Sequence, residues 1–488
     1  MVARLVLIFS PLVIGPVLFD IPEYSIAWSL AASVFIATVA QTNWFRESAY
    51  DKSFTHSLLR PGSMFHILFV SYHIIGGTIY AVNGSGHSLF GTVVSDLTYD
   101  PTFMSKCQRL MLLSHASVTA GMKLVGFGYN QPQFRLRSIP PYHLTVVSFV
   151  SLGISRTAVS FSGLGHFADT VAAISATAIL VEIYMCLRYR RYGNLAVALV
   201  PLGMNLINQA VSGWKGLVLL TVLTLAALLY NLMPKRVLVV GTIFLFFWAL
   251  YFYPFGLALR PLLWYKAVPQ NIAVEMSINK TLSLSFEERL NVIWASFSAR
   301  ANDLVQFRKY IEFVPARHPY YGFDIVRNAL IALIPRTFSP EKPDMEVVSM
   351  QRVYEAGVVS KQATVSAKSS FYQDAYLSGD WPVVILASLL FGFLIMVISH
   401  TCERLFGGYE IGTCLIFTGL FADAVNSPPN FLFFVGTILS SLLVMIVMFF
   451  LGKATGWILP TDNSMAPAVS HAEDLRMVTL AGEHAGRS

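Results

Sequence analysis

Apolar residues fill most of this chain in long runs that are separated by short polar segments. The runs are about 17–25 residues long, enough for an α-helix to cross a hydrocarbon core of about 30 Å. Segments such as VLVVGTIFLFFWALYF do not alternate between apolar and polar positions, which argues against a membrane β-barrel. The pattern therefore predicts an all-α polytopic membrane protein with about twelve transmembrane helices.

The runs fall into two groups on either side of a more polar interval. We place the twelve spans at residues 2–19, 24–42, 62–82, 108–128, 141–161, 168–187, 194–213, 215–232, 237–258, 381–400, 410–425 and 430–451. The chain then divides into helices 1–9 (1–258), an extramembrane segment (259–380), helices 10–12 (381–451) and a tail (452–488). The tail is polar and rich in Ala, Gly and Ser, which predicts disorder.

The distribution of positive charge predicts the orientation of these helices. Cytoplasmic loops of membrane proteins are enriched in Lys and Arg. With the N-terminus in the cytoplasm, the inner loops hold Arg46, Lys52, Arg60, Arg135, Arg137, Arg188, Arg190, Arg191, Lys235, Arg236 and Arg404, and the short outer loops little beyond Lys106 and Arg109. We expect both termini to be cytoplasmic. The net charge of +7 then reflects orientation and does not point to nucleic acid.

The interval 259–380 faces the outside in this topology, and its length predicts a small folded cap. Ser285 and Glu288 form a capping-box pattern before a stretch free of Gly and Pro that runs to Val314. A second helix is expected from Phe323 to Ala332. The sequence SGDWP at 378–382 predicts the start of the tenth span, with Asp380 as its N-cap.

Within the cap, the sequence IPRTFSPEKP at 334–343 combines three prolines with two cations. Prolines make this stretch rigid, and rigid cations beside a bilayer suit a fixed anionic partner. The planar guanidinium of Arg336 can grip phosphate oxygens with two hydrogen bonds, and Lys342 lies in the same turn. A phosphate group of a lipid or of a lipid-linked substrate is the expected ligand.

Three segments together carry a family resemblance: SARANDLVQF, HPYYGFDIVRNALIALIPRTFSPEKP and SSFYQDAYLSGDWPVVILASLLFGF. They resemble the Wzy-type O-antigen and exopolysaccharide repeat-unit polymerases, and the resemblance is concentrated in residues 295–395. It implies a GT-C-like membrane glycosyltransferase that uses polyprenyl-diphosphate-linked oligosaccharide at the periplasmic face. It also implies no nucleotide sugar, no metal and no cofactor.

The resemblance implies that cations bind the diphosphate. Arg336 is the strongest candidate, and Arg300, on the first expected helix of the cap, is the second. Arg308 follows Arg300 by eight residues, which places both on roughly one helical face. Related enzymes carry an Arg at the outer end of a tight hairpin. Here the hairpin reads QAVSGWKGLVLL, and Lys215 stands where that Arg would be expected. A lysine keeps the positive charge but cannot donate two parallel hydrogen bonds to phosphate.

Other candidates concern the glycan and the proton. Tyr372 and Tyr376, four residues apart, are expected to stack on sugar or to line an opening. The general base is left open among His318, Asp303 and Asp374, and Asp303 can instead pair with Arg300.

Several polar residues lie in or at the ends of the predicted spans: His66 and His73 in the third, Arg156 late in the fifth, and Asp423 and Asn426 near the outer end of the eleventh. His66 and His73 share a face of the third span, and we expect each to be hydrogen-bonded between helices. Polar groups in spans are costly and tend to be functional.

The expected reaction is direct displacement with inversion at the anomeric carbon, in which diphosphate leaves from the growing chain and a base deprotonates the acceptor. The partners would be the lipid-linked oligosaccharide, membrane lipids and a chain-length regulator. Two alternatives use similar chemistry or architecture. A lipid-linked oligosaccharide flippase should have two similar halves and no large one-sided cap. An O-antigen ligase differs in its acceptor.

Overall fold

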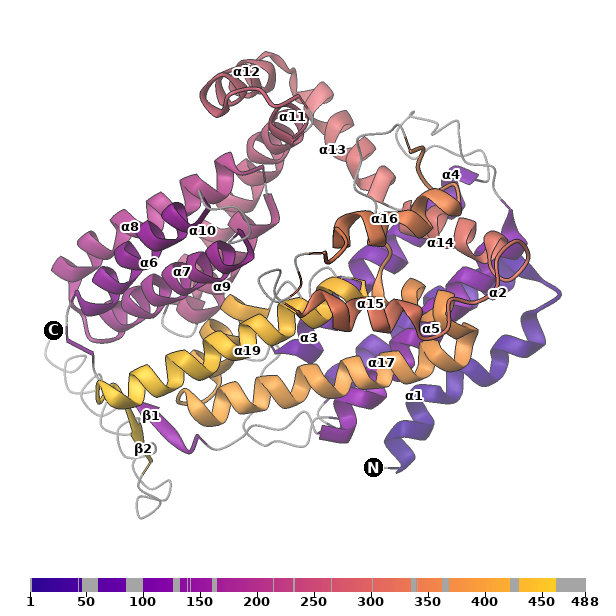
Figure 1. Ribbon diagram of the computed structural model, residues 1–488, viewed down its shortest axis with the longest axis horizontal. Helices are drawn as coiled ribbons and strands as arrows, with labels where there is room; N and C mark the ends of the chain where they lie inside the picture. The colour runs from indigo at the N-terminus through magenta and orange to yellow at the C-terminus, as the bar shows by residue number, and fades with distance from the viewer. Residues whose placement is uncertain are drawn as a thin grey trace, which may run out of the picture.

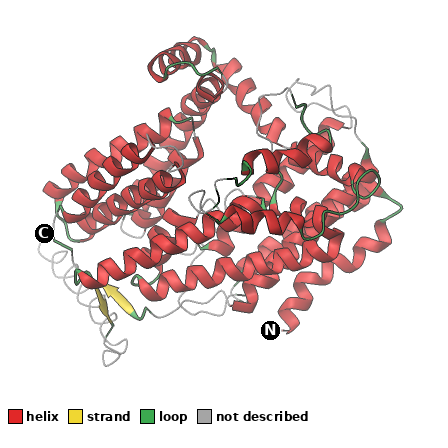
Figure 2. Cartoon of the chain, in the orientation of Figure 1, coloured by secondary structure: helices red, strands yellow, loops and turns green. Residues whose placement is uncertain are grey.

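The computed structural model describes residues 2–42, 44–45, 60–84, 100–125, 132–137, 139–140, 142–159, 165–213, 215–230, 233–264, 266–300, 302–334, 339, 341–361, 368–421 and 430–461. The fold is a helical bundle with one small two-stranded sheet (Figures 1 and 2). The elements of the first half are α1 (Val2–Ile14), η1 (Gly15–Leu18), α2 (Pro22–Gln41), α3 (Pro61–Phe69), the π-helical η3 (Val70–Ile75), α4 (Gly76–Gly84), α5 (Pro101–Val125), β1 (Phe134–Leu136), α6 (His143–Val159), α7 (Gly165–Arg188), α8 (Tyr192–Val211), α9 (Lys215–Tyr230) and α10 (Pro234–Phe247). Those of the second half are the π-helical η4 (Trp248–Phe252), α11 (Tyr253–Trp264), α12 (Gln270–Ser283), α13 (Phe286–Arg300), α14 (Asn302–Phe313), α15 (Asp324–Ala332), α16 (Met345–Glu355), α17 (Phe371–Leu405), the π-helical η5 (Tyr409–Phe417), α19 (Phe431–Ala454) and β2 (Ile458–Pro460).

Every segment that the apolar runs mark as a span contains helix. Six helices among the described residues are long and apolar enough to cross a membrane: Pro22–Gln41, Val171–Arg188, Tyr192–Val211, Pro234–Trp264, Phe371–Leu405 and Phe431–Ala454. Shorter apolar helices cover Val2–Leu18, Val218–Tyr230 and Tyr409–Phe421. The all-α membrane class is therefore confirmed. The ninth segment runs on to Trp264, beyond the predicted boundary at 258.

The centre of the bundle is the crossing of α5 and α17, which is set by a glycine on each helix. A Cβ atom on Gly121 would lie 2.1 Å from the carbonyl oxygen of Leu389, and one on Gly392 would lie 2.1 Å from that of Val118. These distances are far below van der Waals contact, so only glycine lets the two backbones approach this closely.

One end of the bundle joins three segments that the topology places in the cytoplasm. Strands β1 and β2 pair antiparallel, with Phe134 opposite Pro460, and the Gln133 amide donates to the Arg404 carbonyl at 3.0 Å. We call this the strand end. The prediction of disorder from residue 452 is wrong for residues 452–461, because α19 continues to Ala454 and β2 pairs with β1. Residues 462–488 lie outside the described part.

The opposite end, which we call the cap end, carries α14, α15 and α16 on the first turns of α5, α17 and α19. Figure 1 shows α12, α13, α14 and α16 at the top and right, away from the strands at lower left. The Tyr321 amide donates to the Leu377 carbonyl at 2.9 Å, and the Tyr376 hydroxyl donates to the Val314 carbonyl at 2.9 Å. The interval between the ninth and tenth spans is thus folded helical structure.

Two of the cap's predicted helices are found, one of them in altered form. The capping box is present: the Ser285 amide donates to Glu288 at 2.7 Å, and the Glu288 amide donates to the Ser285 hydroxyl at 3.2 Å. The helix after it is divided into α13 and α14, so the prediction of one helix to Val314 is wrong. Helix α15 matches the expected segment, whereas α12 and α16 were not predicted.

Helix α17 is broken where the sequence predicts a new start. Gly379 (φ 177°, ψ 40°) and Asp380 (φ 61°, ψ −158°) are non-helical, and they separate a short buried turn from the long apolar helix that follows. The positive φ of Asp380 is rare outside glycine. The four cysteines, Cys107, Cys186, Cys402 and Cys414, are buried and free.

Candidate functional site at the cap end

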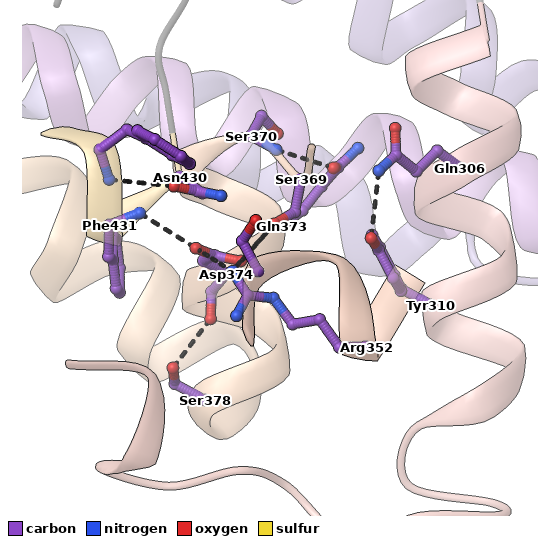
Figure 3. Close-up of polar contacts among 12 residues, drawn as sticks. Gln306, Tyr310, Arg352, Ser369, Ser370, Gln373, Asp374, Ser378, Asn430 and Phe431 are labelled. Atoms are coloured by element: carbon purple, nitrogen blue, oxygen red, sulfur yellow. Dashed lines mark hydrogen bonds and ion pairs between the residues drawn. The ribbon is translucent and has the colours of Figure 1, made fainter. Parts of the chain in front are cut away.

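The first turns of α17 form a buried polar junction between the cap and the apolar helices (Figure 3). Asp374 is fully buried, and its Oδ1 lies 2.7 Å from Nη2 of Arg352 on α16. Ser369 Oγ donates to the same oxygen at 2.5 Å, and the amide of Phe431, which begins α19, donates to Oδ2 at 3.0 Å. One carboxylate therefore ties α16, α17 and α19 together.

This geometry removes Asp374 from the general-base candidates. A base needs an oxygen within reach of the substrate hydroxyl. Both oxygens of Asp374 already accept hydrogen bonds inside the protein, and Arg352 Nη2 also lies 2.9 Å from Oδ2. The role of Asp374 is structural.

The two tyrosines of the same segment are also interior residues, and this corrects the expectation that they stack on sugar. Tyr372 is 1% exposed, and its ring packs edge-on against His73 and Phe307, with centroids 5.3 and 5.5 Å away. Tyr376 is fully buried, and the ammonium of Lys106 lies 5.6 Å from its ring centre. Protein covers both rings, so neither offers a face to a glycan.

Lys342 closes the end of helix α15. Its ammonium donates to the carbonyl oxygens of Ala332 and Ile334 at 2.5 and 2.9 Å. Carbonyls at a helix C-terminus lack intrahelical partners, so a cation there stabilises the end. Lys342 therefore stabilises the C-terminal end of α15.

Arg308, with a side chain that is 18% exposed, lies between the cap and α5, and His318 is partly buried within the cap. Arg308 Nε donates to Glu312 at 2.5 Å, and its guanidinium lies 5.9 Å from the ring centre of Phe103 on α5. His318 stacks on Tyr321 at 4.4 Å, and its Nδ1 lies 2.6 Å from the Pro319 carbonyl oxygen. If Nδ1 is the protonated nitrogen of this neutral ring, it donates this bond and leaves Nε2 as a possible base.

The remaining cation candidates fall partly outside the described residues. The structure does not describe Arg336. It describes the backbone positions of Arg300 and Lys215, and of the acidic candidate Asp303, but not their side chains. Arg300 ends α13, and Asp303 lies in the first turn of α14. The argument that Arg300 and Arg308 share one helical face is therefore wrong, because they lie on different helices.

The α8–α9 hairpin brings the backbone of Lys215 to the start of the cap. Its tip is a turn with Gly213 at φ +80°, a conformation that favours glycine. The indole of Trp264 donates to the Ser212 carbonyl at 3.3 Å, and Gln270 donates to the Val211 carbonyl at 3.3 Å. Lys215, the first residue of α9, therefore lies at the cap end.

The cap end contains a second group of polar side chains, to which the sequence analysis assigned no joint chemical role. It consists of Lys106 on α5, Tyr320 in the cap, and Tyr376 and Asp380 on α17. The Tyr320 and Tyr376 rings meet edge-on, with centroids 6.1 Å apart. Partial burial, followed by the Asp380 carboxylate, raises the pKa of Tyr320.

Deeper in the bundle, His66 Nδ1 and His115 Nε2 lie 2.9 Å apart and link α3 to α5. The expectation of an interhelical hydrogen bond is confirmed for His66. The His73 ring packs against that of Phe69, with centroids 4.3 Å apart and an interplanar angle of 51°. Within the described part of the chain, no three His, Cys, Asp or Glu side chains are grouped as metal ligands would be.

Comparison with known proteins gives a family. A family model matches residues 10–459, which include the apolar helices and the cap. The chain belongs to the DUF8712 family. That family is described as a domain of unknown function, and no curated protein or solved structure matches the chain. The DUF8712 match covers both ends of the bundle, so the family domain comprises the cap together with the helices that carry it.

Proposed function

We propose that this DUF8712 protein is a membrane glycosyltransferase that polymerises polyprenyl-diphosphate-linked oligosaccharide repeat units at the periplasmic face of the bacterial inner membrane. One observation supports this most strongly. The three segments that resemble the Wzy-type polymerases pack together at one end of the apolar helices. The ring of Phe307 in the first lies edge-on to that of Tyr372 in the third, and the Tyr321 amide in the second donates to the Leu377 carbonyl in the third. A lipid-linked substrate needs its reacting diphosphate at that level, where apolar helices meet a polar cap.

The reaction would join two lipid-linked glycans. The anomeric carbon of the growing chain loses its diphosphate, and negative charge grows on the leaving oxygens. Arg336, with Arg300 and Lys215, would stabilise this charge, and preplaced cations are effective because they need no reorganisation. Lys342 would act by fixing the turn that presents Arg336. Attack from the opposite face inverts the anomeric centre, and no metal is required.

The cap also bears on the two alternatives. It is inserted once, between α11 and α17, which weighs against a flippase built from two similar halves. A ligase would share the diphosphate site and differ only in the acceptor. The partners we propose are the lipid-linked oligosaccharide, surrounding lipids and a chain-length regulator.

The test is a strain that lacks this protein, with its lipid-linked glycans extracted and sized. Loss of a polymerase leaves single repeat units on the carrier, accessible from the periplasm. Loss of a flippase leaves them on the cytoplasmic side, and loss of a ligase leaves full-length polymer on the carrier. Either of the last two patterns contradicts the proposal.

A further inference from the structure

The break in α17 holds an aspartate in a backbone conformation that aspartate rarely adopts. Asp380 has φ 61° and ψ −158°, a region that is essentially reserved for glycine. Such strain costs about 1–3 kcal/mol and persists only where the surroundings impose it, often at functional sites. The glycine of this break is the preceding residue, Gly379, where a Cβ atom would lie 2.6 Å from a Val383 methyl carbon.

The surroundings of Asp380 differ from those of the other acids near the junction. Asp374 is closed off by Arg352, and Glu312 is paired with Arg308. Asp380 is only half-buried, and it has no cationic partner among the residues that the structure describes. Its carboxylate instead lies near enough to the Tyr320 hydroxyl to raise the pKa of that phenol, after partial burial, which is the larger cause. The next residue, Trp381, is 55% exposed, so this position is open to the exterior.

Helix capping does not account for the residue. An N-cap residue normally has extended backbone angles, and its side chain accepts from an amide in the first helical turn. Asp380 has neither the angles nor, in the described chain, such a bond, whereas Asn430 at the start of α19 does accept from the Phe433 amide at 3.1 Å. The expectation that Asp380 serves as an N-cap is therefore wrong, although the helix does restart there.

We propose that Asp380 is the general base of the polymerisation reaction, an inference that rests on the proposed function. Its carboxylate takes the proton from the acceptor sugar hydroxyl as that oxygen bonds to the donor's anomeric carbon. The bond from that carbon to the diphosphate oxygen breaks, and its electron pair leaves with the polyprenyl diphosphate. The proton then passes from Asp380 to water. Tyr320 is a positioning residue that orients the carboxylate.

The test uses the full-length protein in liposomes, with lipid-linked repeat units extracted from a polymerase-deficient strain of the same organism. Asp380→Asn keeps the size and tolerates a positive φ but cannot accept the proton. Asp380→Gly relieves the backbone strain and also lacks the base, and Asp324→Asn is the control at an exposed acid on α15. Turnover, melting temperature and the pH dependence of turnover are measured for each.

We expect Asp380→Asn and Asp380→Gly to lower turnover by about 10²–10⁴-fold, the usual effect of a general base. The melting temperature should be unchanged in Asp380→Asn and raised in Asp380→Gly. Asp324→Asn should have the turnover and melting temperature of the unaltered protein. The unaltered protein should lose turnover as the pH falls, because its base becomes protonated, and the residual turnover of Asp380→Asn should lack that loss.

An Asp380→Asn protein that polymerises within about threefold of the unaltered rate overturns this inference and leaves the proposed function standing, because a lost general base costs far more. Lower turnover that only follows a lower folded fraction also overturns it. If the unaltered protein makes no polymer, the proposed function itself fails, and this inference loses its basis.

Discussion

Arg352 and Asp374 form an ion pair that is shut off from solvent, with side chains 6% and 0% exposed and Nη2 2.7 Å from Oδ1. The pair joins the cap helix α16 to the first turn of α17, and the Phe431 amide adds α19 to the same carboxylate. A buried charge that loses its partner is left desolvated. The packing of the cap on the apolar helices therefore depends on both residues.

Removing one member of this pair should destabilise the protein strongly. Arg352→Ala or Asp374→Asn should lower the free energy of unfolding by about 3–5 kcal/mol, seen as lower abundance and a lower melting temperature in detergent. The control is Arg327→Ala, because Arg327 and Asp324 form a surface pair at 3.8 Å that should contribute at most about 1 kcal/mol. Equal melting of Arg352→Ala and Arg327→Ala would contradict the assigned role.

The crossing of α5 and α17 gives a prediction about packing. Gly392→Ala places a methyl group against the Val118 carbonyl and should cost about 1–3 kcal/mol or more, because two backbones must separate. Gly436→Ala on α19 is the matched control: nothing lies within 4 Å of its Cβ position, and alanine is the better helix former. Thermal unfolding of both variants distinguishes them. A stable Gly392→Ala protein would mean that the helices cross elsewhere.

The sequence could predict those structural features whose cause lies in residues close together along the chain. A helix that meets lipid must be apolar along its own length, so the expected segment 24–42 is close to the observed Pro22–Gln41. The pairing of β1 with β2 joins residues that are far apart in the sequence, and no local pattern predicts it. The division of α13 from α14 likewise occurs in a stretch with no Gly or Pro.

The candidate site was less accessible to sequence reasoning for a related reason. A tyrosine near a membrane boundary has the same local pattern whether it faces a substrate or the interior, and Tyr372 and Tyr376 proved to be interior. Asp380 was noticed only as the start of a helix. Its backbone angles and its Tyr320 partner are tertiary features that become visible only in the fold.

The orientation of the bundle can be tested with topology reporters. A reporter fused after Lys266 or Lys361 should report a periplasmic position, and one after Arg190 a cytoplasmic one, because the Lys- and Arg-rich loops stay inside. Strand pairing adds that a fusion after Thr461 should agree with Arg190. A cytoplasmic Lys361 would place the cap in the wrong compartment for the proposed reaction.

The proposed binding of the leaving diphosphate by Arg and Lys predicts that turnover needs no divalent metal ion. If Arg and Lys side chains neutralise the diphosphate, polymerisation by purified protein should continue in EDTA at an essentially unchanged rate. Loss of turnover in EDTA, with recovery on adding magnesium or manganese, would show that a divalent ion performs this task. Asp344 and Glu346 would then be tested as ligands by Asp→Asn and Glu→Gln substitution.

The most direct test of the central claim is reconstitution. Purified protein in liposomes is given polyprenyl-diphosphate-linked repeat units, and the glycans are sized with time. We predict a ladder of increasing length with release of polyprenyl diphosphate. Arg336→Ala should lower turnover by about 10²–10³-fold at unchanged melting temperature, and Arg336→Lys should recover only part of it. Repeat units that stay single, whether or not they cross the bilayer, would contradict the account.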